Sequence, residues 1–373
     1  EPVNDDARRI HLSTARQVGI KGGNKCQPGT TRVLTGRGMV AISDVKLGDV
    51  VPALGVKGVV TATYNSLGSV PVYRIRTKRG YVMHGSAEHP VRMAPSGARA
   101  WHGSQYADTA TARWVELAAA KSGEYIRLAF LGAFPKACEI SPADAYFLGL
   151  MTGDGSWCGP NASMSLTTAD EELVDWMQCY LGARGIHTGV GSKRGTTARD
   201  VRWCRKEFKA LVASWGVVFH RSTTKRLPES IWLGTRDVIA AFIRGYADTD
   251  GCATTKPSVV WTSASEGLLA DVQTLLLRFA ILSSRRANKP DGRFRSWRLE
   301  ITGTNLRRYA RDIGFMVPRK ARRLPAPESR RKPQWMKWDR VVSVERVADE
   351  VVYGLTVSPD PLYEADGFLQ HNS

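Results

Sequence analysis

The stretches Phe147–Gly155 (FLGLMTGDG) and Phe242–Gly251 (FIRGYADTDG) decide the fold of the middle of this 373-residue chain. Each joins small and apolar residues to a terminal Asp-Gly pair, as expected of a helix that packs tightly against a neighbour. The terminal aspartates, Asp154 and Asp250, lie 96 residues apart. The sequence therefore predicts the same structural unit twice.

Two further pairs of segments repeat with almost the same spacing. Residues 166–186 and 261–281 each read as a strand, a Ser or Thr cap and an amphipathic helix. The sequence KRLP, which starts at Lys225, is echoed by KARRLP, which starts at Lys320. The three offsets are 96, 95 and 95 residues, so we interpret this region as an internal duplication with a pseudo-twofold axis.

Glycines in the repeated motif predict how its two helices meet. Gly149 and Gly245 lack a side chain where the backbone of a neighbouring helix must approach. Gly155 and Gly251 suit a break at the helix C-terminus. If the two helices pack together, the terminal aspartates converge at their ends.

The charge of the chain favours a polyanionic partner. The net charge is +18 and the isoelectric point is near 9.9. The arginine-rich stretches are Arg285–Arg286, Arg293–Arg298, Arg307–Arg311 and Arg319–Arg331. DNA fits this excess of charge, and the alternative is a solvated basic face on an unrelated protein.

Convergent carboxylates beside a basic surface suit divalent cations and phosphodiester hydrolysis, because Mg²⁺ takes oxygen ligands and generates hydroxide. The sequences GLMTGDG and GYADTDG resemble the two motifs of single-chain LAGLIDADG homing endonucleases. That resemblance implies an α/β domain in which Asp154 and Asp250 hold Mg²⁺ or Mn²⁺, with Lys225 and Lys320 near the active-site water. It also implies double-stranded DNA as partner, at a long site in the host gene that lacks the element. The alternative is that each aspartate only caps its helix.

Composition excludes several other classes of protein. Hydrophobic residues make up 43% of the chain and charged residues 24%, which excludes wholesale disorder. No apolar run approaches the ~18 residues of a membrane span. The six cysteines lack ligand spacing, so we expect reduced cytosolic thiols and neither a zinc site nor a disulfide framework. The cysteines are Cys26, Cys138, Cys158, Cys179, Cys204 and Cys252. We expect the protein in the cytoplasm of a bacterial or phage-infected cell.

The flanks of the duplicated region differ from it in composition. They are rich in Val, Thr and Gly and contain short alternating runs that read as strands. These runs are TRVLT, GVVTATYNS, VYRIRT, VVSVERV and VVYGLTV. We therefore predict an all-β unit that is split by the insertion of the duplicated domain.

Nucleophiles stand at both ends of this split unit. The Cys26 thiol is placed to attack its own upstream carbonyl and convert the Lys25–Cys26 amide to a thioester. Within GYVMHGSAEHPV, Ser86 is followed three residues later by His89, whose imidazole suits protonation of the departing nitrogen. Each feature alone is common, and a lone cysteine is usually a buried small residue.

The C-terminal sequence supplies the remaining groups. The side-chain nitrogen of Asn372 is placed to attack its own carbonyl, with His371 beside it, and Ser373 offers a hydroxyl to accept an acyl group. Residues 26–372 resemble an intein in the order of their features. These are a nucleophile, a helper histidine, an inserted domain and the C-terminal sequence ADGFLQHNS. Residues 114–126 and the VYGLTV segment belong to the same resemblance.

The intein resemblance implies a β-rich Hint fold and four steps without a cofactor. Cys26 undergoes an N-to-S acyl shift, aided by His89 and by Ser86 in place of the usual Thr. Ser373 then attacks the thioester, Asn372 cyclises with help from His371, and an O-to-N shift joins the flanking host segments. The implied organisation is a host segment at 1–25, a splicing domain at 26–130 and 335–372, an endonuclease at 138–332, and Ser373 as the first residue of the downstream host segment.

Two positions depart from the intein pattern. Many inteins have Asp where Gly354 stands, and His where Pro361 stands. Both groups assist proton handling, so their absence puts the middle and last steps in doubt. Asp360 and Asp366 are candidate substitutes.

The residues before Cys26 indicate the host. If Gly-Lys-Ser/Thr followed the junction, Gly22 would begin a phosphate-binding loop, and the segment resembles the ATP site of a phage terminase large subunit. A Gly-Gly-Asn turn without a nucleotide role is the alternative. Three other interpretations stay open for the element: a DNA-binding protein with an inactive nuclease, a splicing-impaired domain that only cleaves, and a hedgehog-like autoprocessing domain. We expect a monomer with two pseudo-symmetric halves and no membrane partner.

Overall fold

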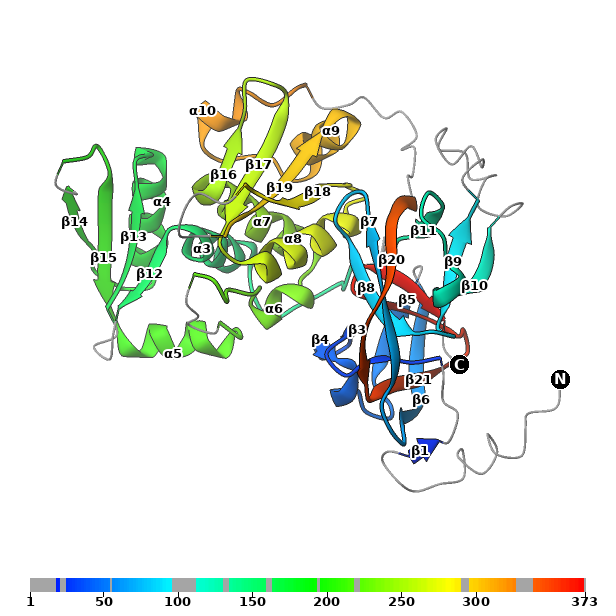
Figure 1. Cartoon of the computed structure of the whole chain (residues 1–373). Helices are drawn as coiled ribbons and strands as arrows, with labels where there is room; N and C mark the ends of the chain where they lie inside the picture. The colour runs from blue at the N-terminus through cyan, green and yellow to red at the C-terminus, as the bar shows by residue number, and fades with distance from the viewer. Residues whose placement is uncertain are drawn as a thin grey trace. The chain divides into compact units, whose positions relative to one another are not determined.

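The computed structural model describes residues 18–20, 25–53, 56–95, 112–129, 134–158, 163–192, 195–217, 222–289, 295–326 and 338–371. The chain divides into two compact units, one formed by residues 1–133 with 332–373 and the other by residues 134–331 (Figure 1). We refer to them as unit 1 and unit 2. Among the helices described, none has the length and apolar character needed to cross a membrane.

In its described residues, unit 1 consists of β-strands and two short 3-10 turns. One sheet has the order β1-β6-β21-β2, with β5 beside β6, and the other has the order β4-β3-β22-β23-β9-β11-β20-β7-β8, with β10 beside β9. The bounds are β1 Val18–Ile20, β2 Gln27–Pro28, β3 Arg32–Thr35, β4 Gly38–Ala41, η1 Ile42–Asp44, β5 Val50–Ala53, β6 Val56–Ser66, β7 Val70–Thr77, β8 Val82–Ser86, β9 Pro90–Ala94, β10 Arg113–Glu116, η3 Leu117–Ala119, β11 Tyr125–Arg127, β20 Trp338–Glu350, β21 Val352–Ser358, β22 Leu362–Ala365 and β23 Phe368–His371. The strands expected from the five alternating runs are all present.

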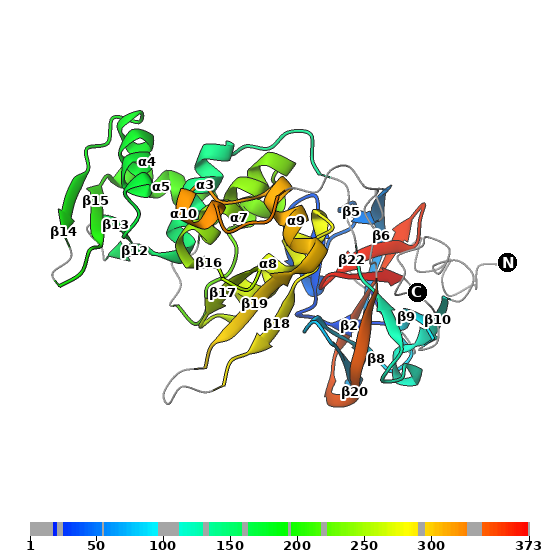
Figure 2. The same cartoon turned by 90° about the horizontal axis from the view of Figure 1, so that it is seen from above.

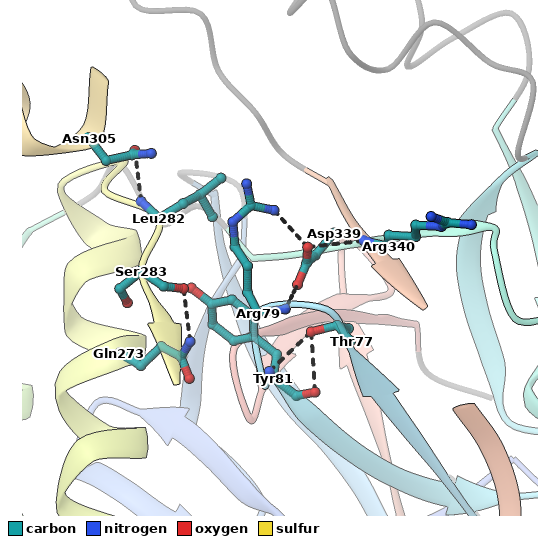
Figure 3. Close-up of polar contacts among 9 residues, drawn as sticks. All are labelled: Thr77, Arg79, Tyr81, Gln273, Leu282, Ser283, Asn305, Asp339 and Arg340. Atoms are coloured by element: carbon teal, nitrogen blue, oxygen red, sulfur yellow. Dashed lines mark hydrogen bonds and ion pairs between the residues drawn. The ribbon is translucent and has the colours of Figure 1, made fainter. Parts of the chain in front are cut away.

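Strands from both sides of the insertion pair with each other in unit 1. β20 is antiparallel to β7, and β21 is antiparallel to β6, so the first and last parts of the chain share one core. At the start of β20, the buried Asp339 accepts hydrogen bonds from the Arg79 backbone nitrogen at 2.9 Å and from Arg79 Nη1 at 2.7 Å (Figure 3). Next to it, a tight turn closes between Thr77 and Tyr81. The segment after the insertion is therefore joined to the segment before it by ladder and side-chain bonds.

Unit 2 is built twice from the same order of elements. Each half has a long helix, four strands and further helices, and the sheet orders β12-β13-β15-β14 and β16-β17-β19-β18 match position by position (Figure 2). The first half has α3 Pro142–Gly153, β12 Gly155–Cys158, β13 Ser163–Thr168, α4 Glu171–Gly182, β14 Gly189–Ser192, β15 Arg199–Cys204, α5 Lys206–Ser214 and α6 Glu229–Trp232. The second has α7 Arg236–Asp250, β16 Gly251–Ala253, β17 Ser258–Ser263, α8 Glu266–Arg278, β18 Ser284–Ala287, β19 Trp297–Thr302, α9 Gly303–Asp312 and α10 Pro318–Ala321.

Helices α3 and α7 lie side by side at the join of the two halves (Figure 1). A Cβ added to Gly149 would lie 2.2 Å from the carbonyl oxygen of Phe242, and one added to Gly245 would lie 2.3 Å from that of Tyr146. No side chain fits in those spaces. The predicted close approach at Gly149 and Gly245 is confirmed.

Gly155 and Gly251 lie at the C-terminal breaks of α3 and α7, as expected, but without a left-handed backbone. Neither residue has the positive φ of a glycine that ends a helix, and each is the first residue of a strand. Their lack of a side chain serves packing instead, because a Cβ at Gly155 would lie 2.4 Å from the Met151 carbonyl oxygen, and one at Gly251 would lie 2.5 Å from that of Ala247. The chain turns so tightly from helix to strand that it touches the preceding helical turn.

Caps and side-chain bonds fix the helices that follow. Ser141 and Asp144 form a capping box at the start of α3, and Ser265 caps α8 by accepting from the Leu268 backbone nitrogen at 3.1 Å. The residue before α4 is Asp170, without a side-chain cap bond, so the Ser or Thr cap expected there is absent. From within α8, the Gln273 side-chain amide donates to the carbonyl of Ser283, which follows the helix, at 3.1 Å (Figure 3).

We expect Gly149→Ala to destabilise unit 2 by at least about 2 kcal/mol, because the added methyl group collides with the backbone of α7. Denaturant unfolding of the full chain would measure the loss. Gly182→Ala is the matched control, since it lies at the end of α4 with nothing within 4 Å of its added Cβ. Equal effects of the two substitutions would contradict the close-packing interpretation.

Candidate active sites

The first candidate site lies where α3 and α7 end. Asp154 is the exposed C-cap residue of α3, and Asp250 is the half-buried last residue of α7. A Cβ added to Gly153 would lie 2.1 Å from Thr249 Oγ1 and 3.3 Å from Asp250 Cγ, so the two helix ends touch. The structure thus brings together the two aspartates that the sequence singled out.

Burial and like charge act on this pair of carboxylates. Burial, followed by the negative charge of Asp154, raises the pKa of Asp250 to about 6, and the positive charges of Lys225 and Lys320 oppose the shift. Two hard oxygen donors whose mutual repulsion a cation would relieve fit Mg²⁺ or Mn²⁺. Within the described residues, no cluster of three or more His, Cys, Asp or Glu side chains could hold a metal ion.

Lys225 and Lys320 occupy equivalent positions at these helix ends. Lys225 Nζ donates to the carbonyl oxygens of Thr152 at 2.7 Å and Gly153 at 3.1 Å. Lys320 Nζ binds the corresponding end of α7, and burial lowers its pKa. Its acceptors are the carbonyls of Ala247 at 3.1 Å, Asp248 at 2.6 Å and Thr249 at 3.2 Å. Each ammonium group satisfies last-turn carbonyls and interacts favourably with the helix dipole.

Sequence reasoning missed Asp248, a buried carboxylate one turn inside α7. It accepts from Tyr146 Oη at 2.8 Å and from the backbone nitrogens of Met316 at 2.9 Å and Val317 at 3.1 Å. Burial raises its pKa, whereas these hydrogen bonds act in the opposite direction. The carboxylate thus ties the segment that carries Lys320 to both long helices. The repeat gave no indication of this role, because its counterpart in the first motif is Thr152.

The arginine-rich stretches do not form one free basic face. Arg285 pairs with Glu266, Arg298 with Glu300 and Arg311 with Asp312. The buried Arg308 donates to the Ala280 carbonyl at 2.8 Å. Arg286, whose side chain is 65% exposed, also lies 3.5 Å from a Glu300 carboxylate oxygen. Part of the positive charge therefore supports the fold of unit 2.

The second candidate site surrounds Cys26 in unit 1. The backbone nitrogen of Cys26 donates to Ser86 Oγ at 3.0 Å, and the backbone nitrogen of Ser86 donates to the Cys26 carbonyl at 2.8 Å. Ser86 ends β8, and a tight turn in which the His89 nitrogen donates to the Ser86 carbonyl leads into β9. Gly85 leaves room for the imidazole, since a Cβ there would lie 3.0 Å from His89 Cβ.

Burial determines the protonation states of the Cys26 thiol and the His89 imidazole. Cys26 is buried, which raises the pKa of its thiol to about 12. His89 is fully buried, which lowers the pKa of its imidazole, whereas Gln370 and the backbone of Lys25 act in the opposite direction. Both groups are neutral at pH 7. His89 Nε2 lies 2.7 Å from Gln370 Oε1 on β23, a partner that nothing in the sequence pattern singled out.

Other predicted residues of unit 1 lie near its C-terminal strands. His371 ends β23, and its ring packs edge-on against Trp114 with centroids 5.1 Å apart. Asn372 and Ser373 lie outside the described residues, as does the Gly-Gly-Asn sequence before Lys25. Asp366, a candidate substitute for the missing acid, has a φ of +50° beside Gly367 in the turn between β22 and β23. A turn role accounts for that conformation.

The ring of Tyr64 covers Gly354. The two residues are paired across β6 and β21, and a Cβ at Gly354 would lie 2.3 Å from the Tyr64 ring and 2.9 Å from its hydroxyl oxygen. Tyr64 also packs in a buried cluster with Cys26, Val72 and Val352. The space that a side chain at position 354 would need is therefore taken by a phenol.

Comparison with known proteins finds a family match within unit 2. Residues 237–314 match the family model of the LAGLIDADG-like domain. The match covers the second half of unit 2, from α7 to the end of α9, and the first half repeats the same order of elements.

The relatives in sequence are larger proteins of different kinds. A DNA polymerase of Thermococcus hydrothermalis is 28% identical over 61% of this chain and 15% of its own length. The replicative DNA helicase DnaB of Rhodothermus marinus is 25% identical over 68% of this chain and 27% of its own length. The chain thus spans only a minor part of these relatives.

Solved structures show lower similarity. The endonuclease I-DmoI, in complex with DNA and calcium, is 19% identical, with a TM-score of 0.39 over 48% of this chain and 95% of that one. The DUF199/WhiA protein of Thermatoga maritima is 11% identical, with a TM-score of 0.36 over 50% of this chain and 60% of its own.

We expect Asp250→Asn to stabilise the metal-free protein at pH 8 by about 1–3 kcal/mol. Because the carboxyl pKa is raised on folding, ionisation disfavours the folded state. That cost is absent below pH about 4, grows as the pH rises to about 6, and stays constant above it. Unfolding in EDTA across this range would measure the difference. The exposed Asp175→Asn is the control, and a gain that did not change with pH would contradict the assignment.

Proposed function

We propose that the chain is a protein-splicing element that carries a site-specific, metal-dependent endonuclease of double-stranded DNA. Unit 2 is the nuclease and unit 1 is a splicing domain with the Hint fold. One observation carries the nuclease proposal: α3 and α7 touch at ends that present Asp154 and Asp250, with a lysine bound at each end. The family match of residues 237–314 supports it.

In the nuclease, Asp154 and Asp250 would hold Mg²⁺ or Mn²⁺. When bound, the cation activates water and neutralises charge on the phosphodiester. Asp250 has to be ionised to bind it, so cleavage should weaken below pH about 6. Lys225 and Lys320 place positive charge beside the reacting phosphates of the two strands. In this proposal, one helix end and one lysine act on each DNA strand.

In the splicing domain, Ser86 and His89 act on the Lys25–Cys26 amide. The Ser86 hydroxyl accepts from the amide nitrogen and fixes its orientation. Since His89 Nε2 is engaged by Gln370 Oε1, Nδ1 is the nitrogen that exchanges a proton at the junction. The thiol, neutral at pH 7, must lose its proton as the sulfur attacks the Lys25 carbonyl, and the departing nitrogen gains one. Holding these groups in one buried site supplies proximity.

The later splicing steps use the C-terminal residues. The Ser373 hydroxyl attacks the thioester and releases the Cys26 thiol, which gives a branched ester. Asn372, assisted by His371, then cyclises to a succinimide and breaks its bond to Ser373. An O-to-N acyl shift restores the peptide bond between Lys25 and Ser373. Each step forms one bond to an acyl carbon and breaks another, without oxidation or reduction. The proposed reaction therefore needs no cofactor.

The relatives support an element that resides in unrelated hosts. A polymerase and a helicase share a segment with this chain over a minor part of their lengths, which fits insertion into different genes. For this chain, the flank that ends in Gly22-Gly-Asn-Lys suits the phosphate-binding loop of an ATPase such as a terminase large subunit. The DNA target would be the same gene without codons 26–372.

We expect the chain, expressed with its natural flanks, to yield ligated flanks and a free 26–372 fragment in intact-mass spectra. Asn372→Ala should block release at the C-terminal junction while thiol reagents still cleave at Cys26. Cys26→Ala should stop N-terminal cleavage. Ligation by either variant would overturn the splicing mechanism, and N-terminal cleavage without ligation in the wild type would favour an autoprocessing domain.

We expect Asp154→Asn to reduce Mg²⁺-dependent DNA cleavage by at least about a hundredfold while splicing continues. The substrate is a supercoiled plasmid that carries the natural gene with codons 26–372 deleted. Asp175→Asn serves as control. Undiminished cleavage would remove Asp154 from the site, and tight binding without cleavage by the wild type would favour an inactive nuclease.

A further inference from the structure

An arginine next to each lysine binds a carboxylate in the opposite half of unit 2. Arg226 follows Lys225 and makes a bidentate pair with Asp271, with Nε to Oδ2 at 2.7 Å and Nη2 to Oδ1 at 2.6 Å. Arg319 precedes Lys320 and pairs with both oxygens of Asp170, with Nη2 to Oδ2 at 2.8 Å. We call these two pairs the cross-half clasps.

The two clasps are reciprocal: in each, the arginine comes from one half and the aspartate from the other, and the halves exchange these roles between the clasps. Asp271 lies on α8 of the second half and holds the segment that carries the lysine of the first. Asp170 precedes α4 of the first half and holds the segment that carries the lysine of the second. Ser265, the counterpart of Asp170 before α8, donates its hydroxyl to the Lys225 carbonyl at 2.7 Å. Equivalent positions thus hold the lysine segments from opposite sides.

The clasps fix the backbone from which each lysine extends. A lysine side chain has a flexible four-carbon stem, so its ammonium group is placed only as well as its backbone is held. Bidentate arginine-carboxylate pairs fix geometry through two parallel charged hydrogen bonds. Asp271 is 5% exposed at its side chain and also accepts from the Leu227 nitrogen, which adds a third bond at the first clasp.

We propose that Asp271 and Asp170 are positioning residues that hold Lys225 and Lys320 at the aspartate-bearing helix ends, so that each cleavage centre depends on the opposite half. This inference rests on the proposed nuclease function for its effect on cleavage. Its geometric part concerns the two lysines and holds independently of that function. Loss of one clasp should impair one DNA strand and leave the other, which converts the enzyme toward a nicking enzyme.

The first test measures lysine accessibility without DNA. The full chain is treated briefly with an amine-acylating reagent, and the labelling of each lysine is quantified by peptide mass spectrometry. In Asp271→Asn, labelling of Lys225 should rise severalfold while that of Lys320 stays constant, and Asp170→Asn should give the reverse. The Asp170 side chain makes no helix-cap bond, so its substitution removes the clasp without removing a cap.

Asp144→Asn is the matched control. Asp144 is also a buried carboxylate paired with an arginine, Arg184, but it lies at the N-terminal end of α3, away from the lysines. Its substitution should lower the unfolding temperature without changing the labelling of Lys225 or Lys320. Unchanged labelling in both clasp variants would overturn the inference, whether or not the protein cleaves DNA.

The second test resolves the two strands on the plasmid without codons 26–372, with each strand labelled separately. Arg226→Lys keeps the charge but loses the bidentate geometry, and it should slow one strand by about tenfold, so that nicked circles accumulate. Arg319→Lys should slow the other strand. Lys225→Ala and Lys320→Ala identify which strand belongs to which lysine.

The outcomes separate the two proposals. Equal slowing of both strands in both arginine variants would reduce the clasps to general stabilisers and overturn the inference. No cleavage by the wild type would instead contradict the nuclease function, and the labelling experiment would then decide the geometric claim alone.

Discussion

The contact between the backbones of α3 and α7 is the constraint on which unit 2 depends. Gly149 and Gly245 let the two helices touch without intervening side chains, and this contact carries the ends of both helices to one place. The carboxylates and lysines at those ends then fall into one small region. A longer interhelical distance would separate the two aspartates and leave two unrelated helix ends, so the chemistry follows from the packing.

Burial prepares both candidate sites before any substrate binds. At the helix ends it raises the pKa of Asp250. Around Cys26 it raises the thiol pKa and lowers that of His89, so both groups are neutral at pH 7. The low-polarity surroundings thus favour the neutral forms of Cys26 and His89, whereas Asp250 is ionised at pH 7 at a cost in free energy.

The two units differ in how they are connected along the chain. Unit 2 is continuous in sequence, whereas unit 1 is assembled from strands on both sides of it, with β20 on β7 and β21 on β6. As a result, the surroundings of Cys26 combine residues from both ends of the chain, including Gln370. An inserted domain is compatible with this arrangement because the strand pairing of unit 1 does not depend on the length of the connection.

The sequence alone determined the duplication, the paired aspartates and the need for glycine at positions 149 and 245, because repeats and helix contacts leave regular spacings. It also singled out Cys26, Ser86 and His89 from their chemistry. Only the tertiary structure decided the partners. The His89–Gln370 contact spans 281 residues and the Arg226–Asp271 pair spans 45, and no local pattern encodes such pairs. The same limit explains Gly155 and Gly251, whose small size serves a steric contact with the preceding helical turn instead of a left-handed backbone.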